Sequence, residues 1–170
     1  IKMSKHKGNV VDPWSVLDKQ GADAVRWYFY TSSAPWLPSR FYPEAVSEAQ
    51  RKYMGTLWNT YAFFCLYADI DNYNPAEYDL KKCKLSLMDK WILSKLNTLI
   101  DTVDKSLAVY NIIDSARALQ DFSDILSNWY VRRGRDRYWG SEMTEDKAAA
   151  YTTLWYVLTT FAKLTAPYTP

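Results

Sequence analysis

The sequence predicts a mainly all-α protein in which a stem-contact segment of short helices precedes an antiparallel helical bundle. Three observations support this fold class. Long segments carry apolar residues three and four positions apart, which is the spacing of one face of an α-helix. Most of these segments are joined by a few residues, as antiparallel neighbours are. Only 5 glycines and 7 prolines occur in 170 residues, too few for a loop-rich or all-β chain.

Two short helices are expected before residue 43. In "DPWSVLDKQG", Asp12 suits the N-cap, Pro13 the first helical position and Gly21 the position just past the end. "ADAVRWYFYTSSAPW" predicts a second helix that ends at the Ser-Ser-Ala-Pro stretch, and the two prolines of "LPSRFYP" indicate a connector. A short strand at Val10 and Val11 is the one strand that the pattern allows. We therefore expect residues 1–42 to form the stem-contact segment.

Four long amphipathic segments follow and are expected to form an incomplete bundle over 43–170. They span 44–69, 86–110, 113–138 and 145–165. Ser86 and Asp89 match a capping box at the start of the second segment. Pro167 ends the fourth. The predicted buried face of the first segment comprises Ala45, Ala49, Tyr53, Leu57, Trp58, Tyr61, Phe64 and Ala68.

Composition excludes several function classes. A net charge of +2 is too small to predict nucleic-acid binding by itself, so any such prediction depends on local clusters. Cys65 and Cys83 lie far apart without a CxxC pair or a histidine cluster, so we expect no metal site. No apolar run reaches the roughly 18 residues of a membrane helix, and no secretory signal is recognised. We expect a cytoplasmic protein.

The amino-terminal string "KMSKHKG" is strongly basic, and no acid precedes Asp12. Lysine is a mobile point charge that suits phosphate oxygens. Composition alone favours a solvated basic loop, which is the alternative interpretation.

The exact string closely resembles the KMSKS loop of class I aminoacyl-tRNA synthetases. Lys2, Met3, Ser4 and Lys5 match the motif, and His6 replaces its final serine. The resemblance implies a loop that closes over ATP and Mg²⁺, with Lys2 and Lys5 as catalytic residues and Lys5 on the departing pyrophosphate. A cation that meets the leaving group only in the closed state lowers the barrier without merely tightening substrate binding.

Other strings extend the resemblance to almost the whole chain. "GADAVRWYFYTSSAPW" looks like the segment that joins the catalytic and tRNA-binding parts in the subgroup for isoleucine, valine and leucine. "TLWNTYAFF", "MDKWILSKLNTLI" and "LSNWYVRRGRDRYW" resemble the helical anticodon-binding domain, and the last of these favours the isoleucine branch.

The resemblance implies a fragment of an isoleucine-specific ligase, from the KMSKS loop through most of the anticodon-binding bundle. The implied partners are tRNA-Ile and the catalytic domain of the same polypeptide, and the fragment is expected to be monomeric. Without the HIGH motif and the nucleotide-binding domain, it is expected to be inactive and to bind no ATP of its own. The alternatives are the corresponding part of a valine ligase and a non-catalytic helical interaction module.

"WYVRRGRDRYW" interleaves four arginines with aromatic residues, a composition that suits RNA. The alternative is an ordinary helix end, where the helix dipole favours positive charge. Helical spacing places Arg133 and Arg137 in line with Leu126 and Trp129. We expect Arg133 to be half-buried and paired with an acid. Arg132 and Arg135 are the candidates for RNA phosphate. Trp129 is either part of the core or a stacking contact for tRNA.

Overall fold

The computed structural model describes residues 3–170, and within this range it contains helices and no strand, Val10 and Val11 included. Short 3₁₀ turns span Lys5–Lys7, Pro75–Glu77 and Leu80–Lys82, and π-helical turns span Arg51–Gly55 and Leu126–Val131. The α-helices are α1 (Pro13–Gln20), α2 (Ala22–Ser32), α3 (Pro43–Gln50), α4 (Thr56–Ile70), α5 (Leu87–Ala108), α6 (Ile112–Ile125), α7 (Arg132–Gly134), α8 (Asp136–Trp139) and α9 (Glu145–Thr165).

The predicted helix ends are confirmed where side chains cap them. Asp12 accepts a hydrogen bond from the backbone nitrogen of Trp14 at 3.3 Å. Gly21 follows α1 with φ of 87°, a left-handed conformation that glycine adopts at little cost. The capping box forms as predicted: the Ser86 nitrogen donates to Asp89 Oδ2 at 2.8 Å, and the Asp89 nitrogen donates to Ser86 Oγ at 3.2 Å. Local chemistry therefore sets these boundaries.

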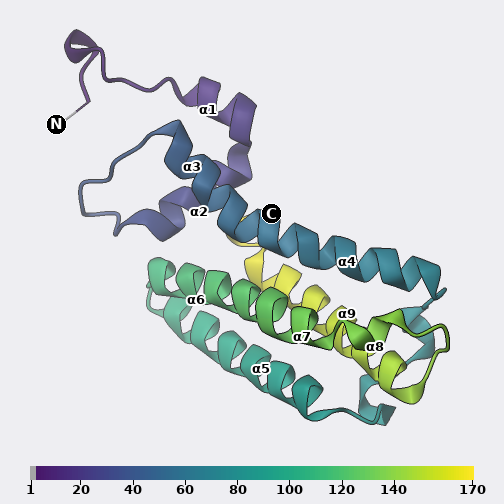
Figure 1. Ribbon diagram of the computed structural model, residues 1–170. Helices are drawn as coiled ribbons and strands as arrows, with labels where there is room; N and C mark the ends of the chain where they lie inside the picture. Colours follow the sequence, from purple (N-terminus) through teal and green to yellow (C-terminus); the bar gives the residue numbers. More distant parts are fainter. Residues whose placement is uncertain (1–2) are drawn as a thin grey trace.

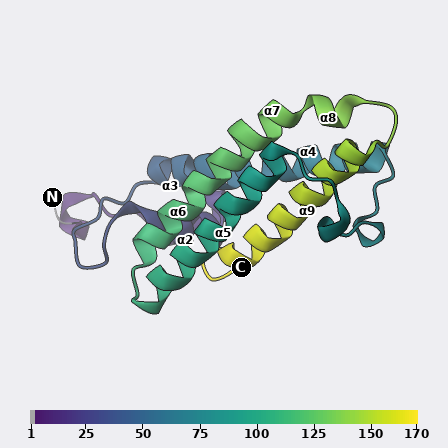
Figure 2. The same cartoon turned by 90° about the horizontal axis from the view of Figure 1, so that it is seen from below.

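The long helices pack side by side as a bundle, and α1–α3 lie together at one end of it (Figures 1 and 2). α5 contacts both α6 and α9, and α4 contacts α9. The π-helical turn Leu126–Val131 joins α6 to α7, so that the two continue in one direction before the chain turns back at α8 (Figure 2).

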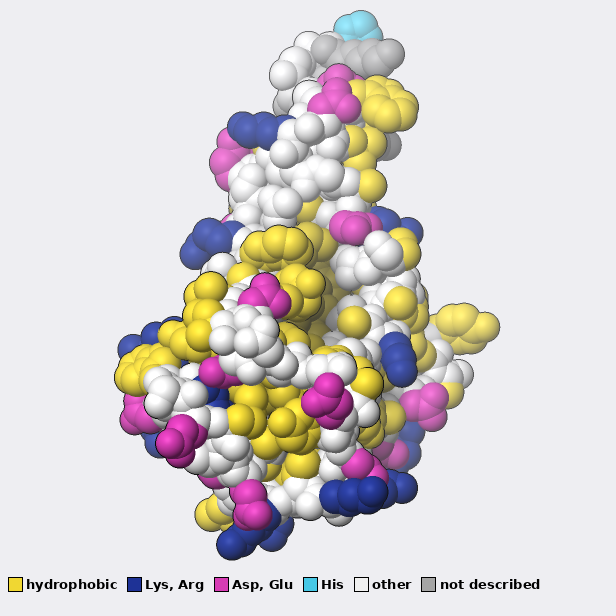
Figure 3. All heavy atoms as spheres, turned by 90° about the vertical axis from the view of Figure 1, so that its right-hand side faces the viewer, with side chains coloured by type: hydrophobic (Ala, Val, Ile, Leu, Met, Phe, Trp, Pro, Cys, Tyr) yellow, Lys and Arg dark blue, Asp and Glu magenta, His cyan; other side chains and the backbone are white. Residues whose placement is uncertain are grey.

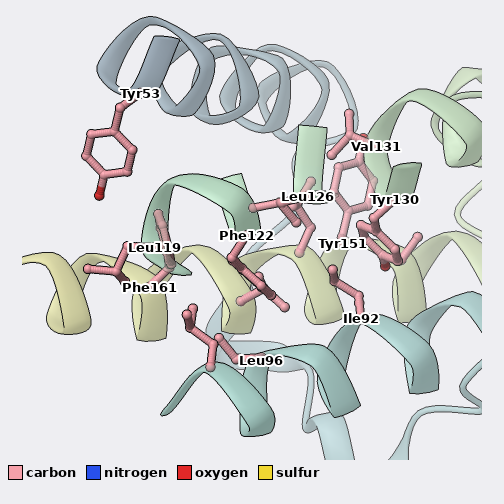
Figure 4. Packing of buried hydrophobic residues seen from close by; sticks show 14 of the residues in the cluster. Tyr53, Ile92, Leu96, Leu119, Phe122, Leu126, Tyr130, Val131, Tyr151 and Phe161 are labelled. Atoms are coloured by element: carbon pink, nitrogen blue, oxygen red, sulfur yellow. The ribbon is translucent and has the colours of Figure 1, made fainter. Parts of the chain in front are cut away.

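Buried side chains from α5, α6, α9 and both π-helical turns form the main core. Figure 4 shows these side chains converging between the ribbons: Tyr53, Ile92, Leu96, Leu119, Phe122, Leu126, Tyr130, Val131, Tyr151 and Phe161. Burying one such side chain stabilises the fold by roughly 1.5–3 kcal/mol. The core therefore supplies the rigid frame on which the surface side chains of α4, α7 and α8 are held.

The amino-terminal helices are attached firmly to this frame. Trp27 of α2 is fully buried and stacks on Tyr53, with ring centroids 3.6 Å apart. The Arg26 guanidinium donates to the carbonyl oxygens of Tyr168 at 2.8 Å and Pro167 at 3.0 Å. A smaller core of Val16, Ala24, Tyr28 and Val46 holds α1, α2 and α3 together.

The predicted buried face of residues 44–69 is wrong at two positions. Trp58 is 66% exposed and Tyr61 is 47% exposed, whereas Thr60 and Ala68 are buried. α4 lies along the outer edge of the bundle (Figure 1), so only one side of it is covered. Because nearly every residue from Leu57 onward in this helix is apolar, hydrophobicity alone does not indicate which side that is.

Candidate nucleic-acid interface

The amino-terminal basic segment folds into a compact turn. The Lys7 nitrogen donates to the Ser4 oxygen at 2.9 Å, and the Ser4 nitrogen donates to Asn9 Oδ1 at 2.8 Å. Gly8, with φ of 61°, reverses the chain. Met3 and His6 are exposed on this turn. Lys2 lies outside the described residues, and the backbone of Lys5 begins the 3₁₀ turn.

A cleft of about 900 Å³ separates this turn from the connector between α2 and α3. Met3 and Asn9 line it from one side, and residues 38–42 line it from the other. The Tyr28 hydroxyl donates to the carbonyl oxygen of Arg40 and so ties the connector to α2. The basic turn thus faces a wall of fixed position.

The arginine-rich segment, residues 129–139, begins with Trp129 inside the π-helical turn, and its first arginine, Arg132, begins α7. Arg132, Arg133 and Arg135 are exposed, and none of the ion pairs formed by residues 3–170 includes any of them. The Arg133 guanidinium carbon lies 4.1 Å from the centroid of the Trp129 ring, and Trp129 is 49% exposed. Arg135 lies over the ring of Phe63 at 6.0 Å. Three cations are therefore available on one short stretch of surface.

The prediction that Arg133 is half-buried and paired with an acid is wrong. A π-helical turn takes more residues than an α-helical turn, so the helix face that packs on the core shifts by about one residue. After Leu126 the buried positions are Tyr130, Val131 and Tyr138. The shift moves Trp129 and Arg133 outward.

Arg137 takes the role predicted for Arg133. Its guanidinium binds the carboxylate of Asp89 through Nη1 at 2.7 Å and Nη2 at 2.9 Å, and it also binds Asp146 at 2.8 Å. Asp89 has no exposed side-chain surface, and it accepts a further hydrogen bond from the Tyr130 hydroxyl at 2.6 Å. This network ties α5, α8, α9 and the π-helical turn together.

Two opposing effects set the acidity of Asp89. Burial on its own raises the pKa of this carboxyl group, but hydrogen bonds from Arg137, Tyr130 and Ser86 outweigh it and hold the pKa below its ordinary value. The carboxylate is therefore ionised at neutral pH and remains the counter-charge of Arg137.

Sequence reasoning missed the aromatic side chains that border the arginines. Trp139 is 58% exposed, and its Nε1 donates to the Tyr67 hydroxyl at 2.9 Å. The rings of Tyr67 and Phe63 lie 4.8 Å apart, and Arg135 covers Phe63. The tryptophan in "RDRYW" was the available signal, but only the packing of α8 against α4 shows that it belongs to this surface.

Positive and negative side chains are mixed on the end of the molecule where α8 lies, which is the right-hand side of Figure 1. Figure 3 shows dark-blue and magenta side chains interspersed there, with hydrophobic side chains in a hollow between them. Among the described residues, no group of three or more His, Cys, Asp or Glu is placed to hold a metal ion. None of the described helices is both long and apolar enough to span a membrane.

Two family models match parts of this chain. Residues 89–170 match the family described as the anticodon-binding domain of tRNA ligase, and residues 1–36 match tRNA synthetases class I (I, L, M and V). The isoleucine–tRNA ligase of Clostridium novyi is 58% identical over 170 residues, which are 100% of this chain and 16% of the ligase. That of Dehalococcoides mccartyi is 50% identical over 169 residues, or 99% of this chain and 17% of the ligase. The chain thus spans about one sixth of the length of these relatives.

A solved structure shares the fold. It is a chain of the ternary complex of Agrobacterium radiobacter LeuRS, tRNA and LeuAMS, with a TM-score of 0.73 and 23% identity. The match covers 99% of the present chain and 19% of that chain.

Proposed function

Because the chain belongs to the class I tRNA synthetases, we propose that it serves as the tRNA-docking part of an ATP-dependent isoleucine–tRNA ligase. The observation that carries this proposal is the 58% identity to an isoleucine–tRNA ligase along all 170 residues. In the proposed division of the chain, residues 1–42 contact the tRNA stem and serve the catalytic centre. Residues 43–170 bind the anticodon arm of tRNA-Ile.

The proposed RNA contacts are Arg132, Arg135 and Trp129. Both guanidinium groups are exposed and unpaired with acids among residues 3–170, so they can meet phosphates without breaking an ion pair of the fold. Asp136 is the one acid between residues 129 and 139. The local charge therefore favours an anionic partner.

The basic turn is proposed to act in adenylate formation, with Lys2 and Lys5 as its catalytic cations. ATP with Mg²⁺ supplies the phosphoric anhydride that is cleaved when isoleucine is activated. The residues of the turn fit a polyphosphate, because Lys7 and His6 are exposed and no acid precedes Asp12. The imidazole of His6 can donate a hydrogen bond where the family motif has a serine hydroxyl.

We propose further that the 170 residues alone are monomeric, bind no ATP and do not form isoleucyl-adenylate. A cation can stabilise a leaving group, but positioning of two substrates supplies a large share of such a rate enhancement. The positioning groups are proposed to lie in the catalytic domain of the full polypeptide, in the cytoplasm. Release of pyrophosphate by the purified chain with isoleucine and ATP would refute this part.

The binding experiment measures the affinity of the chain for a tRNA-Ile transcript at several salt concentrations, with a tRNA-Val transcript as competitor. Arg132→Ala and Arg135→Ala should each weaken binding and lower the slope of log Kd against log salt by about one phosphate contact. Lys105→Ala is the matched control, since Lys105 is exposed on α5 and forms an ion pair with Asp101. Equal slopes for all three variants would contradict the proposed interface, and preference for tRNA-Val would favour a valine ligase.

A further inference from the structure

Arg133 and Trp129 form a preassembled stack on the surface of the bundle. The guanidinium lies over the indole at 4.1 Å, and both side chains are exposed. A cation over an exposed indole is attracted strongly enough to favour one orientation of the arginine, but too weakly to make the pair a main source of stability. The stack is therefore held in place without being part of the core.

The backbone that presents this stack departs from regular helix geometry. Leu126–Val131 is π-helical, and π-helical turns inside α-helices occur frequently at functional sites. In a continuous α-helix, Trp129 and Tyr130 would lie three and four residues after Leu126 and share its inner face. In the structure Tyr130 and Val131 are buried, whereas the indole of Trp129 is 49% exposed.

We infer that the Trp129–Arg133 stack is a binding site for one unpaired nucleobase of RNA. A guanidinium group has two flat faces, and bases stack on such planes as they do on aromatic rings. One side of the Arg133 guanidinium meets Trp129, and its exposed side is available to a base. This inference rests on the proposed tRNA-docking function, and it assigns to Arg133 a task that differs from the phosphate contacts of Arg132 and Arg135.

Stacking and phosphate binding differ in a measurable way. A phosphate contact depends on charge, so it contributes to the salt dependence of binding. A stacking contact depends on the flat surface, so exchanging arginine for lysine removes it while the charge stays. Arg133→Lys should therefore lower the affinity without changing the salt slope, whereas Arg132→Lys should change neither strongly.

The experiment uses the full 170-residue chain and three RNA probes: a tRNA-Ile transcript, a single-stranded oligoadenylate, and a blunt RNA duplex with the same number of phosphates. Arg133→Lys and Trp129→Leu should weaken binding to the first two probes by about 5- to 150-fold, the factor that corresponds to one stacked base. Trp129→Phe should restore most of the loss because it keeps a ring. Binding to the duplex should change by less than about twofold, since its bases are already stacked.

Controls separate the possible failures. Trp14→Leu removes an indole that is 70% exposed on α1, away from this surface (Figure 1). It should leave binding to the oligoadenylate unchanged, because residues 1–42 are proposed to contact only the tRNA stem, which that probe lacks. Thermal melting of each variant identifies loss of binding that follows from unfolding, and Arg133→Lys, at an exposed position, should melt as the unchanged chain does. Wild-type affinity of Arg133→Lys for oligoadenylate and tRNA-Ile would overturn the inference, while reduced salt slopes for Arg132→Ala and Arg135→Ala would leave the proposed function standing. Absence of any RNA binding by the unchanged chain would overturn both.

Discussion

Replacing Arg137 with alanine should destabilise the bundle by roughly 3–5 kcal/mol, the usual cost of leaving a buried charge without its partner. Asp89 has no exposed side-chain surface, and Arg137 supplies two of its hydrogen bonds, at 2.7 and 2.9 Å. After the substitution the carboxylate retains Tyr130 and Ser86, which are neutral donors. Loss of the ion pair with Asp146 adds little to the cost in stability, because the Asp146 side chain is 56% exposed and water screens the pair.

The pH dependence of this effect has a defined sign. In the unchanged chain the pKa of folded Asp89 lies below its ordinary value, so its ionisation stabilises the fold above about pH 4. That stabilisation is lost as the pH falls through the lower pKa of the folded state. In the variant, the hydrogen bonds from Tyr130 and Ser86 alone no longer outweigh the effect of burial. The pKa of Asp89 should therefore rise above its ordinary value, and ionisation of Asp89 should destabilise the fold. The difference in the free energy of unfolding between the two chains should therefore shrink in two steps as the pH falls. The pH first falls through the raised pKa of Asp89 in the variant, and then from about pH 4 through the lowered pKa in the unchanged chain.

Urea unfolding followed by circular dichroism, at neutral pH and at acidic pH, measures both effects. The matched control is Arg133→Ala, which removes an exposed guanidinium and should cost no more than about 1 kcal/mol. If Arg133→Ala costs more than Arg137→Ala, the helix continues through Leu126–Val131 without a π-helical turn, and our assignment of the two arginines is wrong.

Three further outcomes are expected. Lys147→Ala should cost roughly 3–5 kcal/mol in thermal melting, because its ammonium group, 2% exposed, lies 2.5 Å from the carboxylate of Asp71 and 2.6 Å from the carbonyl oxygen of Gly140; an unchanged melting temperature would refute this role. Ser86→Ala should cost about 1 kcal/mol in urea unfolding because the first turn of α5 loses its cap, and a cost near zero would mean that water replaces the hydroxyl. In a complete ligase, Lys5→Ala should lower kcat for adenylate formation, measured by pyrophosphate exchange, and an effect on KM alone would contradict the proposed role.

Helix boundaries were predictable because neighbouring residues determine them. Asp12 before Pro13, and Ser86 three positions before Asp89, satisfy the free amide groups at a helix start wherever the helix packs. The structure accordingly begins α1 at Pro13 and α5 at Leu87. The all-helical class followed from a different signal, the spacing of apolar residues three and four positions apart.

The side of the helix that bears Arg133 was not predictable, because a π-helical turn has no sequence signature of its own. Within this turn the Tyr130 hydroxyl donates to the carboxylate of Asp89. Trp129 and Arg133 then lie on the outer side, and of the two arginines expected on the inner face only Arg137 pairs with a buried acid. The basic character of the segment was evident from composition, but the assignment of individual arginines required the fold.

The attachment of α2 to the bundle determines where the chain can bend. Trp27 stacked on Tyr53 and the Arg26 guanidinium on the last carbonyl oxygens fix this helix from two directions. We therefore expect α2, and α1 with it, to move together with the bundle as one body if the bundle changes its orientation. The basic turn is joined to α1 through residues 8–12, so the position of this turn relative to the arginine-rich segment depends on the conformation of that stretch.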